Sequence, residues 1–229
     1  MKRERTIETF DIEIPRIFAY RLLGMKKSGR RPRESVMEIF EDEFARAHEL
    51  VDAKAVMRMS HAGLPGSTHI DSAMPVVVVV CTIGPALETR VAELIGKDEN
   101  ARAIILDSIG SAAAEEVADR SNQIICSMAS PTDFAPDTRR SPGYGTWNIR
   151  EQRAIFDYLE PGDIGVTLTD TCMMVPRKSV SYAVPLEGGK PGEGKDHRCE
   201  NCNMEHCAYR GDGDDALFDW MNEKGDPKQ

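Results

Sequence analysis

Three cysteines near the end of the chain have the spacing of a metal-binding motif. They are Cys199, Cys202 and Cys207, which form the pattern C-x2-C-x4-C in a polar segment with no hydrophobic core to explain them. Three thiolates joined by His197 or His206 would complete the tetrahedral set that zinc prefers. The spacing also suits an iron–sulfur cluster whose fourth ligand is Cys172 or lies outside the chain. The pattern predicts a metal or cluster, against the alternative of three free thiols, and leaves its identity open.

A second group of residues combines arginines with a glycine-flanked tyrosine. Residues 139–147 read Arg-Arg-Ser-Pro-Gly-Tyr-Gly-Thr-Trp. Gly143 and Gly145 would let the backbone beside Tyr144 approach a ligand closely, because no side chain stands in the way. The planar guanidinium of Arg139 offers paired donors that suit a carboxylate or a phosphate. Taken alone, the pattern is also typical of an ordinary surface turn.

A third stretch, residues 164–181, reads Ile-Gly-Val-Thr-Leu-Thr-Asp-Thr-Cys-Met-Met-Val-Pro-Arg-Lys-Ser-Val-Ser. An apolar strand that ends in small hydroxyl residues, an acid and a methionine pair is unusual for a plain core. Met173 and Met174 would ordinarily be core residues, since methionine adapts to irregular gaps. The stretch therefore becomes informative only together with residues 139–147.

In this order, the two stretches resemble the activation domain of vitamin B12-dependent methionine synthase, and most closely its small free-standing versions. The resemblance covers roughly residues 85–186 and is carried by Arg139 with Pro-Gly-Tyr, then by Leu-Thr-Asp, Met-Val-Pro and Ser-Val-Ser. It implies an α+β fold with a twisted antiparallel sheet flanked by helices. It also implies that the chain binds S-adenosylmethionine.

The resemblance assigns roles to individual residues. Arg139 would pair with the methionyl carboxylate of the ligand, and Glu115 would hold its ammonium group. Tyr144 would face the corrinoid at the mouth of the site, as the residue nearest to the chemistry. Asp133 stands where the family has a glutamate. The remaining residues expected to line the ligand are Pro142, Gly143, Tyr182 and Val184.

The function implied is that of an accessory component of cobalamin-dependent methionine synthase. S-adenosylmethionine would remethylate the corrinoid during reductive reactivation, with the cobalamin held by a separate methionine synthase subunit or another corrinoid protein. A flavodoxin or a ferredoxin would supply the electron. Two alternatives remain: an iron–sulfur electron carrier or corrinoid-protein activator that uses the C-terminal cysteines, and a structural adaptor held together by zinc.

Charge and composition narrow the class of protein. The chain has 229 residues and a formal net charge of −9, which argues against a main task in binding nucleic acid. The longest apolar run, residues 74–81, is eight residues long and too short to cross a membrane. The N-terminus leads into no apolar segment of the secretory type, so we expect a cytoplasmic protein. Residues 1–33 carry ten basic and four acidic groups, net +6, and form either a solvated loop or a docking patch for an acidic surface.

Hydrophobic periodicity indicates the elements that would position these residues. We predict helices over 15–23, 34–58, 85–95, 100–125, 149–159 and 214–222, and strands or extended segments over 6–14, 75–81, 164–168 and 175–186. Within 100–125, two faces repeat every four residues. The apolar face is Ile105, Ile109, Ala113 and Val117, and the polar face is Asp107, Ser111, Glu115 and Asp119.

Helices and strands alternate too irregularly for a doubly wound sheet, so an α+β class is predicted. Residues 1–187 would form the activation-like domain. Four glycines and a proline within residues 188–194 mark the start of a flexible linker. Residues 188–229 would therefore be a linker with a cysteine-rich, metal-binding tail.

Overall fold

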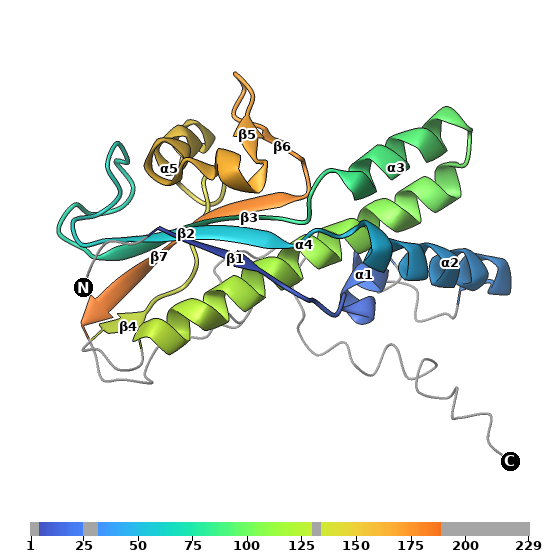
Figure 1. Ribbon diagram of the computed structural model, residues 1–229, viewed down its shortest axis with the longest axis horizontal. Coiled ribbons are helices and arrows are strands. Elements are labelled where there is room, and N and C mark those ends of the chain that lie inside the picture. Colours follow the sequence, from blue (N-terminus) through green and yellow to red (C-terminus); the bar gives the residue numbers. More distant parts are fainter. Residues whose placement is uncertain (1–4, 25–31, 130–133, 189–229) are drawn as a thin grey trace, which may run out of the picture.

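A five-stranded antiparallel sheet forms the centre of the molecule (Figure 1). The computed structural model describes residues 5–24, 32–129 and 134–188. The strands follow the spatial order β1-β2-β3-β7-β4, so the last long strand lies beside the third. Their bounds are Thr6–Thr9 (β1), Lys54–Ser60 (β2), Val76–Thr82 (β3), Phe134–Pro136 (β4) and Ser179–Gly188 (β7). A small hairpin pairs β5 (Thr167–Leu168) with β6 (Met174–Val175).

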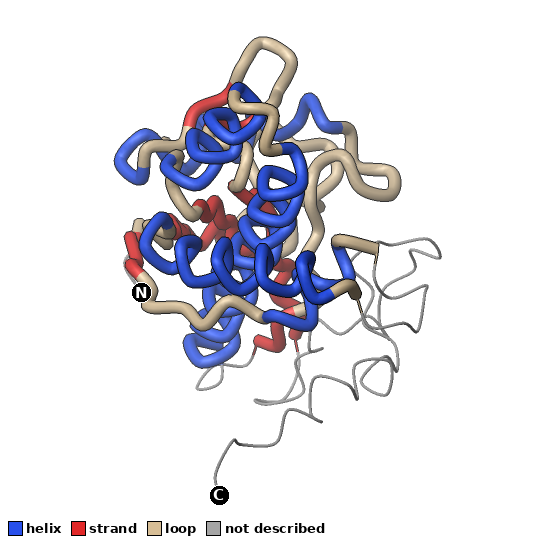
Figure 2. The backbone as a smooth tube through the Cα atoms, turned by 90° about the vertical axis from the view of Figure 1, so that its right-hand side faces the viewer, coloured by secondary structure: helices blue, strands red, loops and turns tan. Residues whose placement is uncertain are grey.

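Helices cover both faces of the sheet (Figures 1 and 2). The larger layer consists of α1 (Arg16–Leu22), α2 (Glu34–Leu50), α3 (Ala86–Gly96) and the long α4 (Asn100–Ala129). The opposite face carries the 3₁₀ turn η2 (Ile149–Glu151), helix α5 (Gln152–Leu159) and the 3₁₀ turn η3 (Pro161–Ile164). The fold is α+β with a curled antiparallel sheet flanked by helices, as the sequence predicted.

The valine run of β3 is apolar throughout because both of its faces are buried. Val79 packs into the core on the α4 side, whereas Val78 and Val80 pack under α5. Strand β7 alternates in the same way, with Tyr182 on the α4 side and Ala183 on the α5 side. The register that pairs Val79 with Tyr182 aligns these two faces along the sheet.

One prediction of secondary structure was wrong. The helix expected over 34–58 ends at Leu50, where Val51 adopts an extended conformation with ψ 123°. Residues Lys54–Ser60 form β2 instead, because they pair with β3 on one side and with β1 on the other. Alanine and methionine favour helices in isolation, and partners distant in the sequence override that preference here.

Other differences are smaller. The strand expected over 164–168 is reduced to β5, because residues 161–164 form a 3₁₀ turn. Three residues of the expected loop 129–148 form β4 at the sheet edge. Within the described ranges, no helix has the length and apolar character needed to cross a bilayer. The expected linker and tail from residue 189 on, with their predicted helix, and residues 1–4 and 25–31 of the basic N-terminal segment lie outside the described residues.

Candidate functional site

One edge of β7 is left open next to the α4 helix. On one side, β7 pairs with β3 along residues 179–185. On the other side, the described chain pairs only residues 186–188 with β4, and Ala183 with Arg140 in an isolated bridge. The N–H and C=O groups of Ala183 both bond to Arg140, at 2.8 and 2.9 Å. Backbone groups two residues apart on a strand point the same way, so those of Ser181 also face this open edge.

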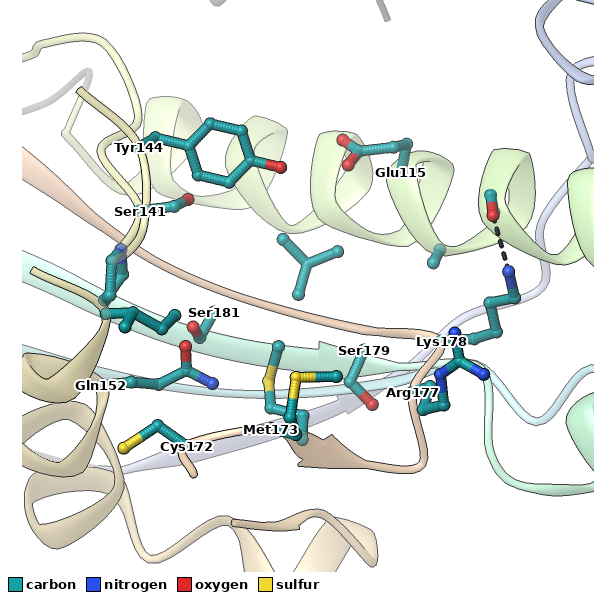
Figure 3. A pocket seen from close by; sticks show the side chains of 16 residues that line it. Glu115, Ser141, Tyr144, Gln152, Cys172, Met173, Arg177, Lys178, Ser179 and Ser181 are labelled. Carbon is teal, nitrogen blue, oxygen red and sulfur yellow. Dashed lines mark hydrogen bonds between the residues drawn. The ribbon is translucent and has the colours of Figure 1, made fainter. Parts of the chain in front are cut away.

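A cleft of about 360 Å³ runs along the open edge of β7 (Figure 3). This volume lies within the range of small-molecule sites in proteins. Helix α4 forms one wall, the turn before η2 closes one end, and the β5–β6 hairpin forms the other wall. The lining side chains are Ser111, Ala114, Glu115, Ser141, Pro142, Tyr144, Ile149, Gln152, Cys172, Met173, Met174, Arg177, Lys178, Ser179, Val180 and Ser181.

The cleft brings together the two stretches that the sequence singled out. Tyr144 comes from the first stretch and Met173 from the second, and both line the same space. Figure 3 shows Tyr144 and Glu115 along one side of β7 and Met173 with Cys172 along the other. Segments some thirty residues apart in the sequence therefore share one concave surface.

Three of the predicted ligand residues line the cleft and four do not. Glu115, Pro142 and Tyr144 are lining residues, whereas the predicted residues Arg139, Gly143, Tyr182 and Val184 are not among them. Tyr182 and Val184 are fully buried in the core on the α4 side. Asp133 and the three tail cysteines Cys199, Cys202 and Cys207 lie outside the described residues. The ligand roles of all these residues stay predictions.

The polar face of α4 lies against two cations. At one end, Lys178 Nζ lies 2.8 Å from Asp107 Oδ1 and donates to Ser111 Oγ at 2.7 Å. At the other end, Arg139 Nη2 lies 2.9 Å from Asp119 Oδ1 and 3.8 Å from Glu115 Oε2. The repeat of polar residues every four positions therefore places α4 against the segments that border the cleft.

Arg139 is buried behind the cleft, with its side chain only 8% exposed. Its guanidinium carbon lies 5.3 Å from the centroid of the Tyr182 ring, within the range of a cation–π contact. Among the described residues, Nη1 of Arg139 has no hydrogen-bond partner. A buried donor without an acceptor costs free energy, so this nitrogen is suited to receive an acceptor.

Glu115 is the acid of the cleft wall, and its carboxylate is only partly neutralised. Burial raises the pKa of Glu115, while nearby Arg139 lowers it and nearby Asp119 raises it, and the net change is upward. The 3.8 Å separation from Arg139 is too long for a hydrogen bond. An ionised Glu115 is therefore short of positive charge, and a cation entering the cleft would supply it.

Sequence reasoning placed two polar residues of the cleft floor, Ser179 and Ser181, in a motif without giving their side chains a role, and it missed Gln152. Ser179, Ser181 and Gln152 are 8%, 4% and 3% exposed, and all three line it. Ser179 Oγ donates to the Pro176 carbonyl at 2.7 Å, which fixes the entry into β7. The usable signal was the pair of serines two positions apart in an otherwise apolar strand, since such residues share one face.

Comparisons with known proteins show the fold. No family model matches the chain, and no curated protein matches it. Among the described residues, no cluster of three potential metal ligands occurs. A crystal structure of the MetH reactivation domain bound to AdoHcy matches with a TM-score of 0.62 and 13% sequence identity, over 85% of this chain and 81% of that one. The chain therefore shares the α+β fold of that reactivation domain.

Proposed function

We propose that this chain binds S-adenosylmethionine in the cleft along β7 and supports the reductive remethylation of a corrinoid held by another protein. One observation carries the proposal: the two motif stretches line a single cleft, at the open edge of a sheet whose fold matches a domain that holds AdoHcy. The resemblance of the motifs to methionine synthase activation domains and the likeness of the folds support the same ligand.

The charges of the cleft suit this ligand. S-adenosylmethionine carries a cationic sulfonium and an ammonium group, and Glu115 offers a carboxylate that lacks a close partner. A ligand carboxylate placed beyond Glu115 would give the buried Nη1 of Arg139 an acceptor. The N–H and C=O groups of Ser181 would bond to polar edges of the ligand, as backbone groups do in many small-molecule sites.

The mouth of the cleft suits a large apolar partner group. Tyr144, Ile149 and Met173 line the cleft and are 54%, 43% and 53% exposed. Exposed apolar side chains gathered around a cleft are typical of an interaction site. In the proposal they contact the corrinoid of a cobalamin-binding methionine synthase subunit or a related protein.

The chain would act by binding and orientation. When the partner is docked, its reduced cobalt supplies the nucleophile that attacks the methyl carbon, and S-adenosylhomocysteine is released. Glu115 would hold the ligand's positive charge, and Tyr144 with Met173 would exclude water from the mouth. Holding the methyl group in line with its acceptor lowers the activation barrier, because the two reactants have already lost their translational and rotational freedom. The electron would come from a flavodoxin or a ferredoxin.

Isothermal titration with S-adenosylmethionine tests the proposal. We expect saturable binding that weakens about tenfold or more in Tyr144→Ala, since aromatic contacts contribute on the order of 1 kcal/mol or more. Ile104→Ala is the matched control, because Ile104 is 62% exposed and does not line the cleft. No heat at millimolar ligand, with Arg139→Ala indistinguishable from the parent, would refute ligand binding.

The cysteine-rich tail supports a second proposal that rests on the sequence alone. We propose that the C-x2-C-x4-C pattern holds either zinc or an iron–sulfur cluster. A cluster would favour an electron-carrying or activating role, and zinc a structural one. Metal and sulfide analysis of protein purified without oxygen would decide between them. The control replaces all three thiols by serine, namely Cys199, Cys202 and Cys207, and metal that persists in it would refute the assignment.

A further inference from the structure

The carboxylate of Glu151 gathers four hydrogen-bond donors from two distant segments. Its Oε2 accepts from Ser67 Oγ at 2.7 Å, from the Thr68 backbone N–H at 3.0 Å and from Trp147 Nε1 at 3.0 Å. Its Oε1 accepts from Thr68 Oγ1 at 2.6 Å. Ser67 and Thr68 lie in the long connection between β2 and β3, about eighty residues away in the sequence. One side chain thus joins that connection to the start of α5.

Trp147 links this cluster to the turn that carries Tyr144. The Trp147 side chain is 2% exposed and stacks on His69, with ring centroids 5.1 Å apart and planes inclined by 8°. Its backbone closes the turn: the carbonyl accepts from the Gly143 N–H at 2.8 Å, and the N–H donates to the Tyr144 carbonyl at 3.1 Å. The indole anchors the base of the turn, while Tyr144 at its apex is exposed.

Contacts within the described chain fix both ends of the turn. On its N-terminal side, Arg140 bonds to Ala183 of β7. On its C-terminal side, the side chain of Trp147 is held between Glu151 and His69. The backbone bonds of Gly143 and Tyr144 themselves stay within the turn. Hence the angle at which Tyr144 stands over the cleft depends on where Trp147 is fixed.

We propose that Glu151 is a positioning residue of the ligand site, which holds Tyr144 over the β7 cleft through Trp147. The inference rests on the proposed function, because it assumes that a ligand fills the cleft. Glu151 itself does not line the cleft, so its effect on binding is indirect. The connection between β2 and β3 would then support a site that it does not touch.

The hydrogen bonds of Glu151 can be disrupted by a substitution that keeps the size of the side chain. All four partners of Glu151 are donors, so Glu151→Gln keeps the size but turns an amide N–H₂ toward a donor. Thr68→Val removes one hydroxyl and leaves the bond to Trp147 intact, as a milder second variant. Asp157→Asn is the matched control, because Asp157 lies exposed on α5 and outside the cluster.

The experiment measures affinity for S-adenosylmethionine by calorimetry, using the full chain. We expect Glu151→Gln to weaken binding about tenfold, Thr68→Val to weaken it less, and Asp157→Asn to leave it unchanged. Adding Tyr144→Ala to Glu151→Gln should cost little more than either change alone, because both act through one turn. Fully additive effects, or parent-like affinity in Glu151→Gln, would overturn the inference.

A second readout separates this inference from the proposed function. The chain has two tryptophans, so in a Trp220→Phe background the one indole N–H resonance belongs to Trp147. Glu151→Gln should shift that resonance and speed amide exchange at Gly143 and Trp147, without ligand. If the parent binds no S-adenosylmethionine but these changes appear, the proposed function fails and the anchoring of the turn stands. If exchange is unchanged, the anchoring fails whatever the ligand.

Discussion

Replacing Glu115 by glutamine should move ligand affinity and stability in opposite directions. The Glu115 side chain is 30% exposed at the cleft wall, with Arg139 Nη2 3.8 Å away. Burial raises the pKa of Glu115, and Asp119 adds to that effect, while Arg139 opposes it without cancelling it. The folded chain therefore holds the ionised carboxylate at a cost, which a functional need for negative charge would explain.

The loss of affinity follows from Coulomb's law. A unit charge at about 4 Å from the carboxylate gains about 1 kcal/mol in water and about 4 kcal/mol at the effective dielectric near a protein surface. Because Glu115 is partly exposed, we place the interaction energy between these limits, at about 2 kcal/mol. Glu115→Gln should therefore weaken the binding of S-adenosylmethionine about 30-fold. If Glu115 holds the ammonium group, the binding of AdoHcy should weaken by the same factor, because AdoHcy keeps that group and lacks the methyl group with its sulfonium charge.

Stability should change with the opposite sign. Because the pKa of Glu115 is raised on folding, the parent loses stability as pH rises above the ordinary value of 4.5, and the glutamine variant does not. The variant should therefore melt at or above the parent temperature at pH 7, with the difference vanishing toward pH 4.5. Glu116→Gln is the neighbouring control, since Glu116 pairs with Arg120 at 2.8 Å on another face of α4.

Titration calorimetry with both ligands and scanning calorimetry from pH 4.5 to pH 8 would measure the two effects. Binding by Glu115→Gln within twofold of the parent, together with a lower melting temperature at pH 7, would refute the reasoning. That pair of results would make Glu115 a structural ion-pair partner of Arg139 and not a ligand residue.

Two further predictions concern the scaffold. Gly110→Ala should lower the free energy of unfolding by about 1–3 kcal/mol, because the new Cβ would lie 2.5 Å from Leu87 Cδ2 where α3 crosses α4. In contrast, a Cβ at Gly96 meets nothing within 4 Å, so Gly96→Ala should raise the free energy of unfolding by up to about 1 kcal/mol. Melting temperatures of both variants check these predictions. Burial works to raise the pKa of Glu151, but hydrogen bonds from Thr68, Ser67 and Trp147 outweigh it and lower the pKa to about 2. The ionised Glu151 therefore stabilises the fold above pH 4.5, and this stabilisation is lost as the pH falls toward 2. Glu151→Gln should lower the free energy of unfolding by about 2 kcal/mol at neutral pH and make it depend less on pH between 4.5 and 2. A parallel loss of stability with falling pH in parent and variant would contradict this.

Local patterns in the sequence predicted the elements that local physics decides. The apolar face of α4 is buried as expected, with Ile105 5% and Ile109 0% exposed. Nothing in the sequence shows that Lys178 and Arg139 return to its polar face from later segments. Periodicity identifies which residues share a face of a helix, and only the tertiary fold identifies what that face meets.

The missed strand β2 has a similar cause. Its sequence, Lys-Ala-Val-Met-Arg-Met-Ser, contains no glycine or proline and continues the apolar spacing of α2. Pairing with the valine run of β3, in the register Met57 to Val79, supplies the reason for an extended chain. A helix there would leave β1 and β3 without a strand between them, and non-local pairing of this kind is invisible to a window of a dozen residues.

The place of the candidate site follows from how the sheet ends. Strand β4 is three residues long and pairs only with the last residues of β7. Residues 179–182 of β7 therefore have no strand beside them on that edge within the described chain. Unpaired backbone groups at a sheet edge must bond to water or to a ligand. Here α4 on one side and the β5–β6 hairpin on the other flank that edge. In the proposed function, a polar ligand that bonds to Ser181 takes the place of the missing strand, which would explain why both motif stretches converge on β7.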